Sequence, residues 1–379
     1  MKILAIETSC DDTGVAILEV KGEKTPVFNV LSNIIASQIE VHKQYGGVYP
    51  FMAKREHEKN LQPSLEAALS QAKVSKKDID LIAVTNGPGL EPCLWVGVNF
   101  AKNLAKKWNV PIVPVNHIES HILVNFLFSP VIPAKAGIQF PAIALVVSGG
   151  HTQLILMEKI GKYKILGETR DDAAGECFDK CAKILGLSYP SGLIISKLAT
   201  GLRALPAGRA LSPVHLPRPM FNTKDYDFSF SGLKTAVLYA WQKIKPTLNS
   251  SDRSNKKSLQ IQMAAEIQQA IIDVLLKKTI KAVKDYNVKA IILGGGVSAN
   301  DELRRQFKEA IENKLVGFLP IGKNPTTIDF LVPPANLSTD NAVMTAIAGY
   351  YNRNKKIAMS DVAKLKADAN LRIGQKMLR

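Results

Sequence analysis

Two histidines four residues apart are the side chains of this sequence best suited to bind a metal ion. His117 and His121 lie in the segment VNHIESH, and side chains spaced i, i+4 share one face of a helix. Both imidazoles can therefore reach one cation, and Asp340 in LSTDN is the carboxylate that we select as a third ligand. Two histidines and one carboxylate with open coordination positions suit iron or zinc. The alternative, that two of the six histidines share this spacing by chance, stays open.

Glycine-rich turns that follow apolar runs form a second group of candidates. The segments SGGHT, from Ser148 to Thr152, and GGGVSAN, from Gly294 to Asn300, each follow a predicted strand. Neither has the spacing of a phosphate-binding P-loop or of the GxGxxG dinucleotide motif. A single glycine-rich turn is more often a tight change of chain direction than a binding site. Several at strand ends favour sites where the backbone approaches a ligand closely, because no Cβ intrudes.

Carboxylates near predicted turns and helix starts are a third group. Asp11 and Asp12 follow the first predicted strand and either hold a metal–phosphate or cap the turn. Asp171 and Asp172 precede a predicted helix and are expected at its N-cap and first turn. Asp179 lies further along that helix, either as a buried functional group or as an exposed carboxylate.

The elements that must position these residues alternate between strands and helices, which predicts α/β layers. Two hairpins, over 2–20 and 141–158, indicate a duplicated architecture. Further strands are expected at 79–85, 111–115 and 290–293, and helices at 96–108, 173–185, 259–286 and from near Asp301. Segments 128–140, 200–219 and 249–257 read as surface insertions or loops. The tail from Tyr350, with eight Lys or Arg and two Asp, is interpreted as a solvated helix rather than an RNA-binding arm.

Composition excludes several classes of protein. The chain has 379 residues, enough for about two domains. Its 49 Lys and Arg against 33 Asp and Glu give a net charge of +16, which fits a nucleic-acid partner or a solvated basic surface. Four cysteines form no disulfide framework, and Cys177 and Cys181 are expected as core thiols. We expect no membrane span and no signal peptide, and hence a cytoplasmic protein.

Nine ordered motifs together resemble the TsaD family of tRNA threonylcarbamoyladenosine-modifying transferases, once described as glycoproteases. They extend from residue 3 to about residue 345, nearly the whole chain, and include every candidate group above. The motifs are IETSCDDTGVAI, HKQYGGVYP, NGPGL, PVNHIESH, LVVSGGHTQL, DDAAGECFDK, DFSFSGLKTAV, GGGVSAN and STDNAVM.

The resemblance implies the actin-like α/β fold of sugar kinases and heat-shock chaperone ATPases, with two related domains around a central cleft. We expect residues 1–135 with 342–379 in the first domain and 136–341 in the second. It also implies that one divalent metal, iron first and zinc second, binds His117, His121 and Asp340. The substrate-binding residues that it implies are Val146, Val147, Ser148, Gly149, Gly150, Asp179, Gly192 and Asn300.

The implied reaction transfers threonylcarbamoyl from threonylcarbamoyl-AMP to N6 of the adenosine next to the anticodon, in tRNAs that read codons beginning with A. The donor is a mixed anhydride that carries AMP as its leaving group, so no enzyme nucleophile is required and we assign no catalytic residue. The implied partners are tRNA, a smaller TsaB-like paralogue and a TsaE-like P-loop ATPase.

Two other functions stay open at this stage. A zinc-dependent glycoprotein peptidase would use the same histidines, although Glu119 lies between them and not directly after the first, as in HExxH. A non-catalytic actin-like ATP-binding scaffold would need the glycine turns but no histidine pair. The sequence also departs from the family pattern: Phe51 replaces an acidic residue, Ser191 a glycine of a Tyr-Pro-Gly-Gly turn, and Pro92 a common glycine.

Overall fold

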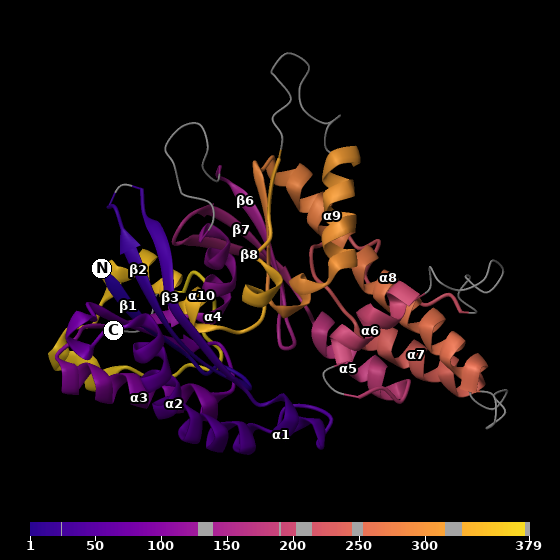
Figure 1. Cartoon of the computed structure of the whole chain (residues 1–379). Helices are drawn as coiled ribbons and strands as arrows, with labels where there is room; N and C mark the ends of the chain where they lie inside the picture. Colours follow the sequence, from indigo (N-terminus) through magenta and orange to yellow (C-terminus); the bar gives the residue numbers. More distant parts are fainter. Residues whose placement is uncertain are drawn as a thin grey trace, which may run out of the picture. The chain divides into compact units, whose positions relative to one another are not determined.

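Two five-stranded sheets with the same strand order organise the chain (Figure 1). The first has the order β3-β2-β1-β4-β5 and the second the order β8-β7-β6-β9-β10, so each strand of the second matches the strand five numbers earlier. β1 pairs antiparallel with β2 and parallel with β4, and β6 pairs parallel with β9. The duplicated α/β architecture expected from the two hairpins is therefore confirmed.

The computed structural model describes residues 1–23, 25–127, 139–188, 191–201, 214–244, 253–314 and 328–375. The chain divides into two units: Met1–Pro141 with Met157–Lys164 and Leu331–Arg379, and Ala142–Leu156 with Ile165–Phe330. Segment 331–341, which we assigned to the second domain, thus groups with the first. Asp340 in this segment lies within 3.7 Å of His117 and 3.2 Å of His121, which belong to the first unit.

The first unit holds the first sheet and the helices around it. Its strands are β1 (Lys2–Glu7), β2 (Asp12–Lys21), β3 (Val27–Ser37), β4 (Leu81–Gly87) and β5 (Ile112–Asn116). Its helices are α1 (Ile39–Lys43), α2 (Pro50–Ala72), α3 (Glu91–Trp108), α4 (His117–Leu123) and α10 (Ala342–Tyr351), with short 3₁₀ helices at Lys76–Asp78, Val124–Phe126, Ala335–Leu337, Arg353–Lys355 and Met359–Lys364.

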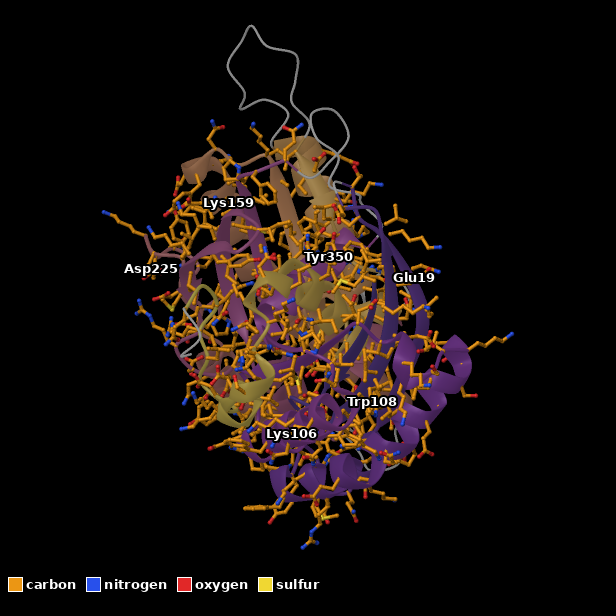
Figure 2. The ribbon with its side chains drawn as sticks, turned by 90° about the vertical axis from the view of Figure 1, so that its left-hand side faces the viewer. Glu19, Lys106, Trp108, Lys159, Asp225 and Tyr350 are labelled. Carbon is orange, nitrogen blue, oxygen red and sulfur yellow. The ribbon has the colours of Figure 1, made fainter. Side chains whose placement is uncertain are left out.

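Helices cover both faces of this sheet, so its central strands contain continuous apolar runs, at 3–6 in β1 and 81–84 in β4. Successive side chains of a strand point to opposite faces. Leu4 and Ile6 of β1 therefore join the core formed with α2 and α3, while the opposite face of β1, β2 and β4 packs against α10. α3 ends with basic residues in its last turn, where they complement the helix dipole. Figure 2 labels two side chains of that turn, Lys106 and Trp108.

The second sheet and its helices make up most of the second unit. Its strands are β6 (Ala142–Val147), β7 (Thr152–Lys159), β8 (Lys162–Glu168), β9 (Ala290–Gly294) and β10 (Asp329–Leu331). Its helices are α5 (Ala174–Ile184), α6 (Ser191–Thr200), α7 (Ser231–Ile244), α8 (Arg253–Tyr286) and α9 (Asp301–Lys314), with a 3₁₀ helix at Gly296–Ala299. Cys177 and Cys181 are buried on α5 with their sulfurs 3.8 Å apart, which confirms them as core thiols.

The tail after Tyr350 is not the solvated helix that we expected. α10 ends at Tyr351, and only two short 3₁₀ helices follow among the described residues up to 375. Ile357 forms a bridge with Ile112 of β5, and Val362 and Leu365 are buried in the core of the first unit. Apolar residues spaced for core contacts therefore override the helical preference of the lysines around them.

Two predicted loops fall partly outside the described residues. Most of the insertions at 128–140 and 200–219, and residues 249–252, belong to the undescribed ranges. The polar run is helical from Arg253 onward, where α8 begins. Among the described helices, none combines the length and apolar character needed to cross a bilayer.

Replacing Gly349 by alanine should destabilise the first unit. An added Cβ would lie 2.5 Å from the Cβ of Ala83 on β4, and overpacking of this kind typically costs about 1–3 kcal/mol. We expect a loss of that size in the free energy of unfolding, measured by urea denaturation. Gly232→Ala on α7 is the control, because its nearest atom would be 3.7 Å away. Equal stability of the two variants would show that α10 is not closely packed on β4.

Candidate functional site

The candidate metal ligands begin at the point where β5 passes directly into α4. Asn116 caps this helix: its Oδ1 accepts hydrogen bonds from the backbone N–H groups of Ile118 and Glu119, at 2.9 and 3.1 Å. Its Nδ2 donates to the carbonyl of Leu371 at 3.2 Å. A capped first turn fixes the direction of the two histidines that follow.

The structure brings together the three residues selected from the sequence as metal ligands. Oδ1 of Asp340 lies 3.7 Å from Nε2 of His117 and 3.2 Å from Nε2 of His121. One ligand atom from each residue falls within 4.8 Å of the others. Both histidines are buried, and Asp340 is partly so. All three residues belong to the first unit.

Asp340 is held in place by its neighbour. Asn341 is the N-cap of α10, and its Oδ1 accepts from the backbone N–H of Met344 at 3.1 Å. Its Nδ2 donates to the carbonyls of Thr339 and Leu337, at 2.8 and 3.2 Å. The backbone on both sides of Asp340 is thus fixed by one side chain.

The chemistry of the cluster fits a divalent cation. Nδ1 of His121 is buried without a hydrogen-bond partner among the described residues, and its buried Nε2 forms no hydrogen bond although it faces Oδ1 of Asp340 at 3.2 Å. A buried polar atom without a partner is costly, and a cation at this position would remove that cost for one nitrogen. Two imidazole nitrogens and one carboxylate oxygen form a donor set typical of iron and zinc sites.

A buried carboxylate that the sequence interpretation missed contacts the first histidine. Oε2 of Glu7 lies 3.5 Å from Nδ1 of His117, and the Ser9 hydroxyl lies 3.1 Å from the same nitrogen. A ligand histidine usually makes such a contact through its second nitrogen, which orients the ring. The signal for Glu7 was its place at the end of the apolar run KILAIE, where a carboxylate becomes fully buried.

Charge–charge interactions set the protonation of this cluster. Burial disfavours the charged His117, but the carboxylates of Asp340 and Glu7 outweigh it and raise the pKa of His117 to about 9. Burial likewise favours neutral Glu7, yet the contact with His117 brings the pKa of Glu7 below its usual value. Burial lowers the pKa of His121. A cation would therefore compete with a proton for the ring of His117.

The NGPGL motif and α3 support the turn that carries Glu7 and Ser9. The backbone N–H of Leu90 donates to the carbonyl of Ser9 at 2.8 Å. A Cβ on Gly89 would lie 2.6 Å from that carbonyl oxygen, and one on Gly97 would lie 2.3 Å from Oγ1 of Thr8. Positions 89 and 97 therefore each require glycine, because neither has room for a Cβ. Pro92 falls in the first turn of α3, where proline is well tolerated.

Glu119, between the two histidines, is engaged elsewhere. Its Oε1 accepts from the hydroxyl of Tyr163 and its Oε2 from Nδ2 of Asn352, each at 2.9 Å. Burial raises the pKa of Glu119. Both oxygens thus tie α4 to neighbouring segments of the first unit.

Asp12, at the start of β2, is a partly buried carboxylate. Its Oδ1 is buried, and no described residue forms a hydrogen bond with it. Burial, followed by the charge of Asp11, raises the pKa of Asp12 from 3.8 to about 7.

The glycine turns come together in the second unit. Val146 of β6 pairs with Gly294 of β9, and a Cβ on Gly295 would lie 2.4 Å from the carbonyl oxygen of Val147. Gly175 in the first turn of α5 is equally close to the carbonyl of Ser148, at 2.5 Å. The two turns predicted from the sequence therefore meet beside the start of α5.

The predicted substrate-binding residues differ in whether their side chains or only their backbone atoms are accessible to a ligand. Val146 and Val147 are fully buried, so only their backbone is available to a ligand. Gly149 and Gly150 are exposed, and no described atom lies within 4 Å of a Cβ built on either. Ser148 closes the turn, since its Oγ accepts from the backbone N–H of His151 at 3.1 Å.

The other three predicted substrate residues lie on separate elements. Asn300 caps α9: its Oδ1 accepts from the N–H of Leu303 at 3.0 Å, and its Nδ2 donates to Oε1 of Gln268 at 2.8 Å. Gly192 begins α6 in open space, and Asp179 is partly buried on α5. Their contact with a substrate stays a prediction.

The roles expected for Asp171 and Asp172 were wrong. α5 begins after Ala173, and its first N–H groups are bound by Thr152 and Glu176 instead. Asp171 accepts hydrogen bonds from the backbone N–H groups of Phe230 and Ser231 at the start of α7. Asp172 pairs with Lys180 and Lys234. Asp171 thus serves the start of α7, whereas Asp172 pairs with one lysine on α5 and one on α7.

Comparisons with known proteins identify relatives over nearly the whole chain. The model of the TsaD family, described as tRNA N6-adenosine threonylcarbamoyltransferase, matches residues 29–347. Proteins with this description from Thermosipho africanus and Bacillus cereus are 43% and 40% identical to the chain. The alignments cover 98% and 94% of this chain, and 100% and 94% of those proteins.

Solved structures resemble the chain only weakly. YeaZ from Pseudomonas aeruginosa is 17% identical, with a TM-score of 0.28 over 44% of this chain and 64% of that one. A ROK hexokinase from Thermus thermophilus is 13% identical, with a TM-score of 0.42 over 94% of this chain and 100% of that one. At these scores the likeness supports no conclusion.

Replacing Asp340 by alanine should weaken metal binding. Loss of a residue that only orients a ligand typically costs about 10- to 100-fold in affinity, so loss of the carboxylate itself should cost at least about 100-fold. The measurement is a competition titration with zinc and a chromophoric chelator. Asp361→Ala removes an exposed carboxylate paired with Lys364 and is the control. Unchanged zinc affinity in Asp340→Ala would remove this residue from the ligand set.

Replacing Asp12 by asparagine should stabilise the protein at high pH. Because the folded-state pKa of about 7 lies above the ordinary 3.8, stability is lost as pH rises between these values. The loss is at most about 4 kcal/mol, at about 1.4 kcal/mol per pKa unit. Urea denaturation should give similar free energies for the wild-type protein and Asp12→Asn near pH 4, and a more stable variant at pH 8. Parallel pH profiles for the two proteins would show that Asp12 ionises normally.

Proposed function

Because the chain belongs to the TsaD family of tRNA N6-adenosine threonylcarbamoyltransferases, we propose that it forms N6-threonylcarbamoyladenosine in tRNA. It would transfer threonylcarbamoyl from threonylcarbamoyl-AMP to the adenosine next to the anticodon, in tRNAs that read codons beginning with A. The observation that carries this proposal is the match to the family over residues 29–347. The cluster of His117, His121 and Asp340 supports it further.

His117, His121 and Asp340 would hold one divalent metal, for which iron is our first assignment and zinc the second. When bound, such a cation supplies Lewis-acid polarisation of an oxygen of the donor. The contribution of the chain is orientation: Glu7 and Ser9 fix the ring of His117 through Nδ1. Nε2 of each histidine then remains on the side of Asp340.

The glycine turns of the second unit would bind the acyl adenylate. Backbone N–H groups of Gly149 and Gly150 suit phosphate oxygens, because no side chain intrudes at either glycine. The N–H of Ser148 instead donates to the carbonyl of His151 at 2.8 Å and holds the turn. Val146 and Val147 would contribute backbone only. Asp179, Gly192 and Asn300 complete the proposed set, and Asn300 keeps one amide hydrogen beyond its bond to Gln268.

The reaction needs positioning more than covalent chemistry. The N6 amine of the adenosine attacks the carbamoyl carbon, the bond to the phosphate oxygen of AMP breaks, and N6 loses a proton. Because the leaving group is already activated, holding the two reactants in line supplies much of the rate. Stabilisation of charge on the carbamoyl and phosphate oxygens supplies the rest.

The remaining parts of the proposal concern partners and place. A net charge of +16 suits the phosphates of tRNA and predicts a salt-sensitive affinity. From the family we also propose a TsaB-like paralogue and a TsaE-like P-loop ATPase as partners. A cytoplasmic location follows from the tRNA substrate.

Neither alternative is favoured. A zinc peptidase of the HExxH type needs a carboxylate as general base near the metal-bound water, whereas both oxygens of Glu119 accept hydrogen bonds from Tyr163 and Asn352. A nucleotide-binding scaffold would not require two buried histidines next to an aspartate. The curated relatives are named as transferases over their full length.

The test is transfer to an unmodified tRNA transcript, with the partner proteins and threonylcarbamoyl-AMP supplied. We expect modified adenosine, detected by mass spectrometry of nucleosides, and its loss with a chelator. His117→Ala should lower the rate at least about 100-fold, as expected when a ligand of an essential metal is removed. The matched control is His215→Ala, because the side chain of His215 is fully exposed.

Three outcomes separate the parts of this proposal. Full activity of His117→Ala would exclude the metal role of that residue. Activity that survives the chelator would exclude a metal requirement. A metal-loaded wild-type protein that makes no product would exclude the transferase and favour the scaffold.

A further inference from the structure

Three large aromatic side chains stand exposed on the turn between α1 and α2. Tyr45 and Tyr49 are each 49% exposed, and Phe51 is 65% exposed. The rings of Tyr45 and Tyr49 stack, with centroids 5.5 Å apart and planes 24° apart, and the ring of Phe51 lies 6.5 Å from that of Tyr49. We call these three residues the aromatic turn. None of them belongs to the hydrophobic core of the first unit.

Hydrogen bonds hold the backbone of this turn in one conformation. Nδ1 of His42 accepts from the backbone N–H of Tyr49 at 3.3 Å, and its Nε2 lies 3.0 Å from Oε1 of Gln38. Pro50 then begins α2 directly after Tyr49. The rings are therefore presented by an ordered backbone, so little conformational freedom would be lost when a ligand binds to them.

The aromatic turn is linked to the loop that orients the proposed metal ligand. Gln38, which contacts His42, also lies 3.4 Å from Nδ1 of His57 on α2. Nε2 of His57 donates to the carbonyl of Cys10 at 3.0 Å. The residue before Cys10 is Ser9, which contacts His117. These contacts link the aromatic turn to the loop that orients His117, and all of these residues belong to the first unit.

Exposed cations flank the aromatic turn and can contact a polyanion. Residues 40–59 carry the cations Lys43, Lys54, Arg55 and Lys59 and the carboxylates Glu40, Glu56 and Glu58. Lys43 and Lys54 pair with Glu40 and Glu58 at 3.5 and 3.6 Å, but all four side chains are 44% exposed or more. Exposed pairs of this kind are worth little, so these lysines can exchange their partners for phosphates.

We propose that the aromatic turn is a stacking platform for an unpaired base of the RNA substrate, next to the adenosine that is modified. The proposal rests on the proposed function, which makes an anticodon loop the substrate. Bases of single-stranded RNA stack on aromatic rings, while nearby cations contact the phosphates. A ring at position 51, where the family pattern has an acid, both adds a stacking face and removes a charge that would repel phosphate.

The double variant Tyr49→Leu with Phe51→Leu tests this platform. Leucine keeps the exposed surface apolar but removes the flat rings, and the backbone N–H of residue 49 can still donate to His42. Stacking on one base is worth about 1–3 kcal/mol, so we expect the Kd for unmodified tRNA to rise about 5- to 150-fold. The measurement is fluorescence anisotropy with the TsaB-like paralogue present. Tyr239→Leu on α7 is the matched control, because Tyr239 is 61% exposed in the second unit.

Two further measurements distinguish loss of stacking from other effects of the substitutions. The slope of log Kd against log salt should not change in the double variant, since that slope reports phosphate contacts and not stacking. Tyr49→Trp with Phe51→Trp should restore tight binding, because tryptophan offers a larger stacking face. A Kd within twofold of wild type in the leucine variant would overturn the proposal.

Other results have equally definite meanings. If the leucine variant loses the paralogue and keeps its affinity for tRNA, the aromatic turn is a protein interface and the proposal is wrong. If the wild-type protein binds no tRNA, the proposed function fails together with the platform. Wild-type binding and transfer that persist unchanged in the leucine variant would refute the platform alone.

Discussion

A carboxylate buried at the end of the first strand is the interaction on which the first unit depends. Glu7 is fully buried, and ionised carboxylates are stable inside a protein only when several donors surround them. Its Oε2 accepts from the hydroxyls of Thr85 and Thr345, and its Oε1 from the backbone N–H of Ser9. Together with His117, these donors come from β4, α10, the β1–β2 turn and α4. The charge is therefore stabilised only when all four segments meet.

Close backbone approaches make that meeting possible. Gly14 lies against Ala342, Gly97 against Thr8 and Gly349 against Ala83, and in each case a Cβ would come within 3 Å of another heavy atom. Such contacts bring α3 and α10 so near to the sheet that short side chains such as threonine and serine can reach Glu7. These three glycines thus serve the packing of the first unit.

Local signals predicted most of the fold and part of the site. The hairpins and parallel strands were predicted because their apolar runs have the right length and are bounded by turn residues. The pairing of His117 with His121 was visible as helical spacing. Glu7, by contrast, has no periodic signal, since its partners lie 78 and 338 residues away. The tail and the roles of Asp171 and Asp172 were wrong for the same reason: long-range contacts decide them.

Buried polar atoms without a hydrogen bond destabilise the folded state, and here they include atoms of the candidate metal ligand His121. Within the described part of the chain, both nitrogens of His121 and Oδ1 of Asp12 are buried without a hydrogen bond. They belong to α4 and to the start of β2, and Ser9, in the loop that precedes β2, contacts His117 at the start of α4. A stable fold could fill these positions with apolar residues at less cost. A cation bound at His121 would offset the cost at that residue, because binding stabilises whichever state it prefers. The buried histidine thus lowers the stability of the first unit when no ligand is bound, and a ligand bound there would raise it.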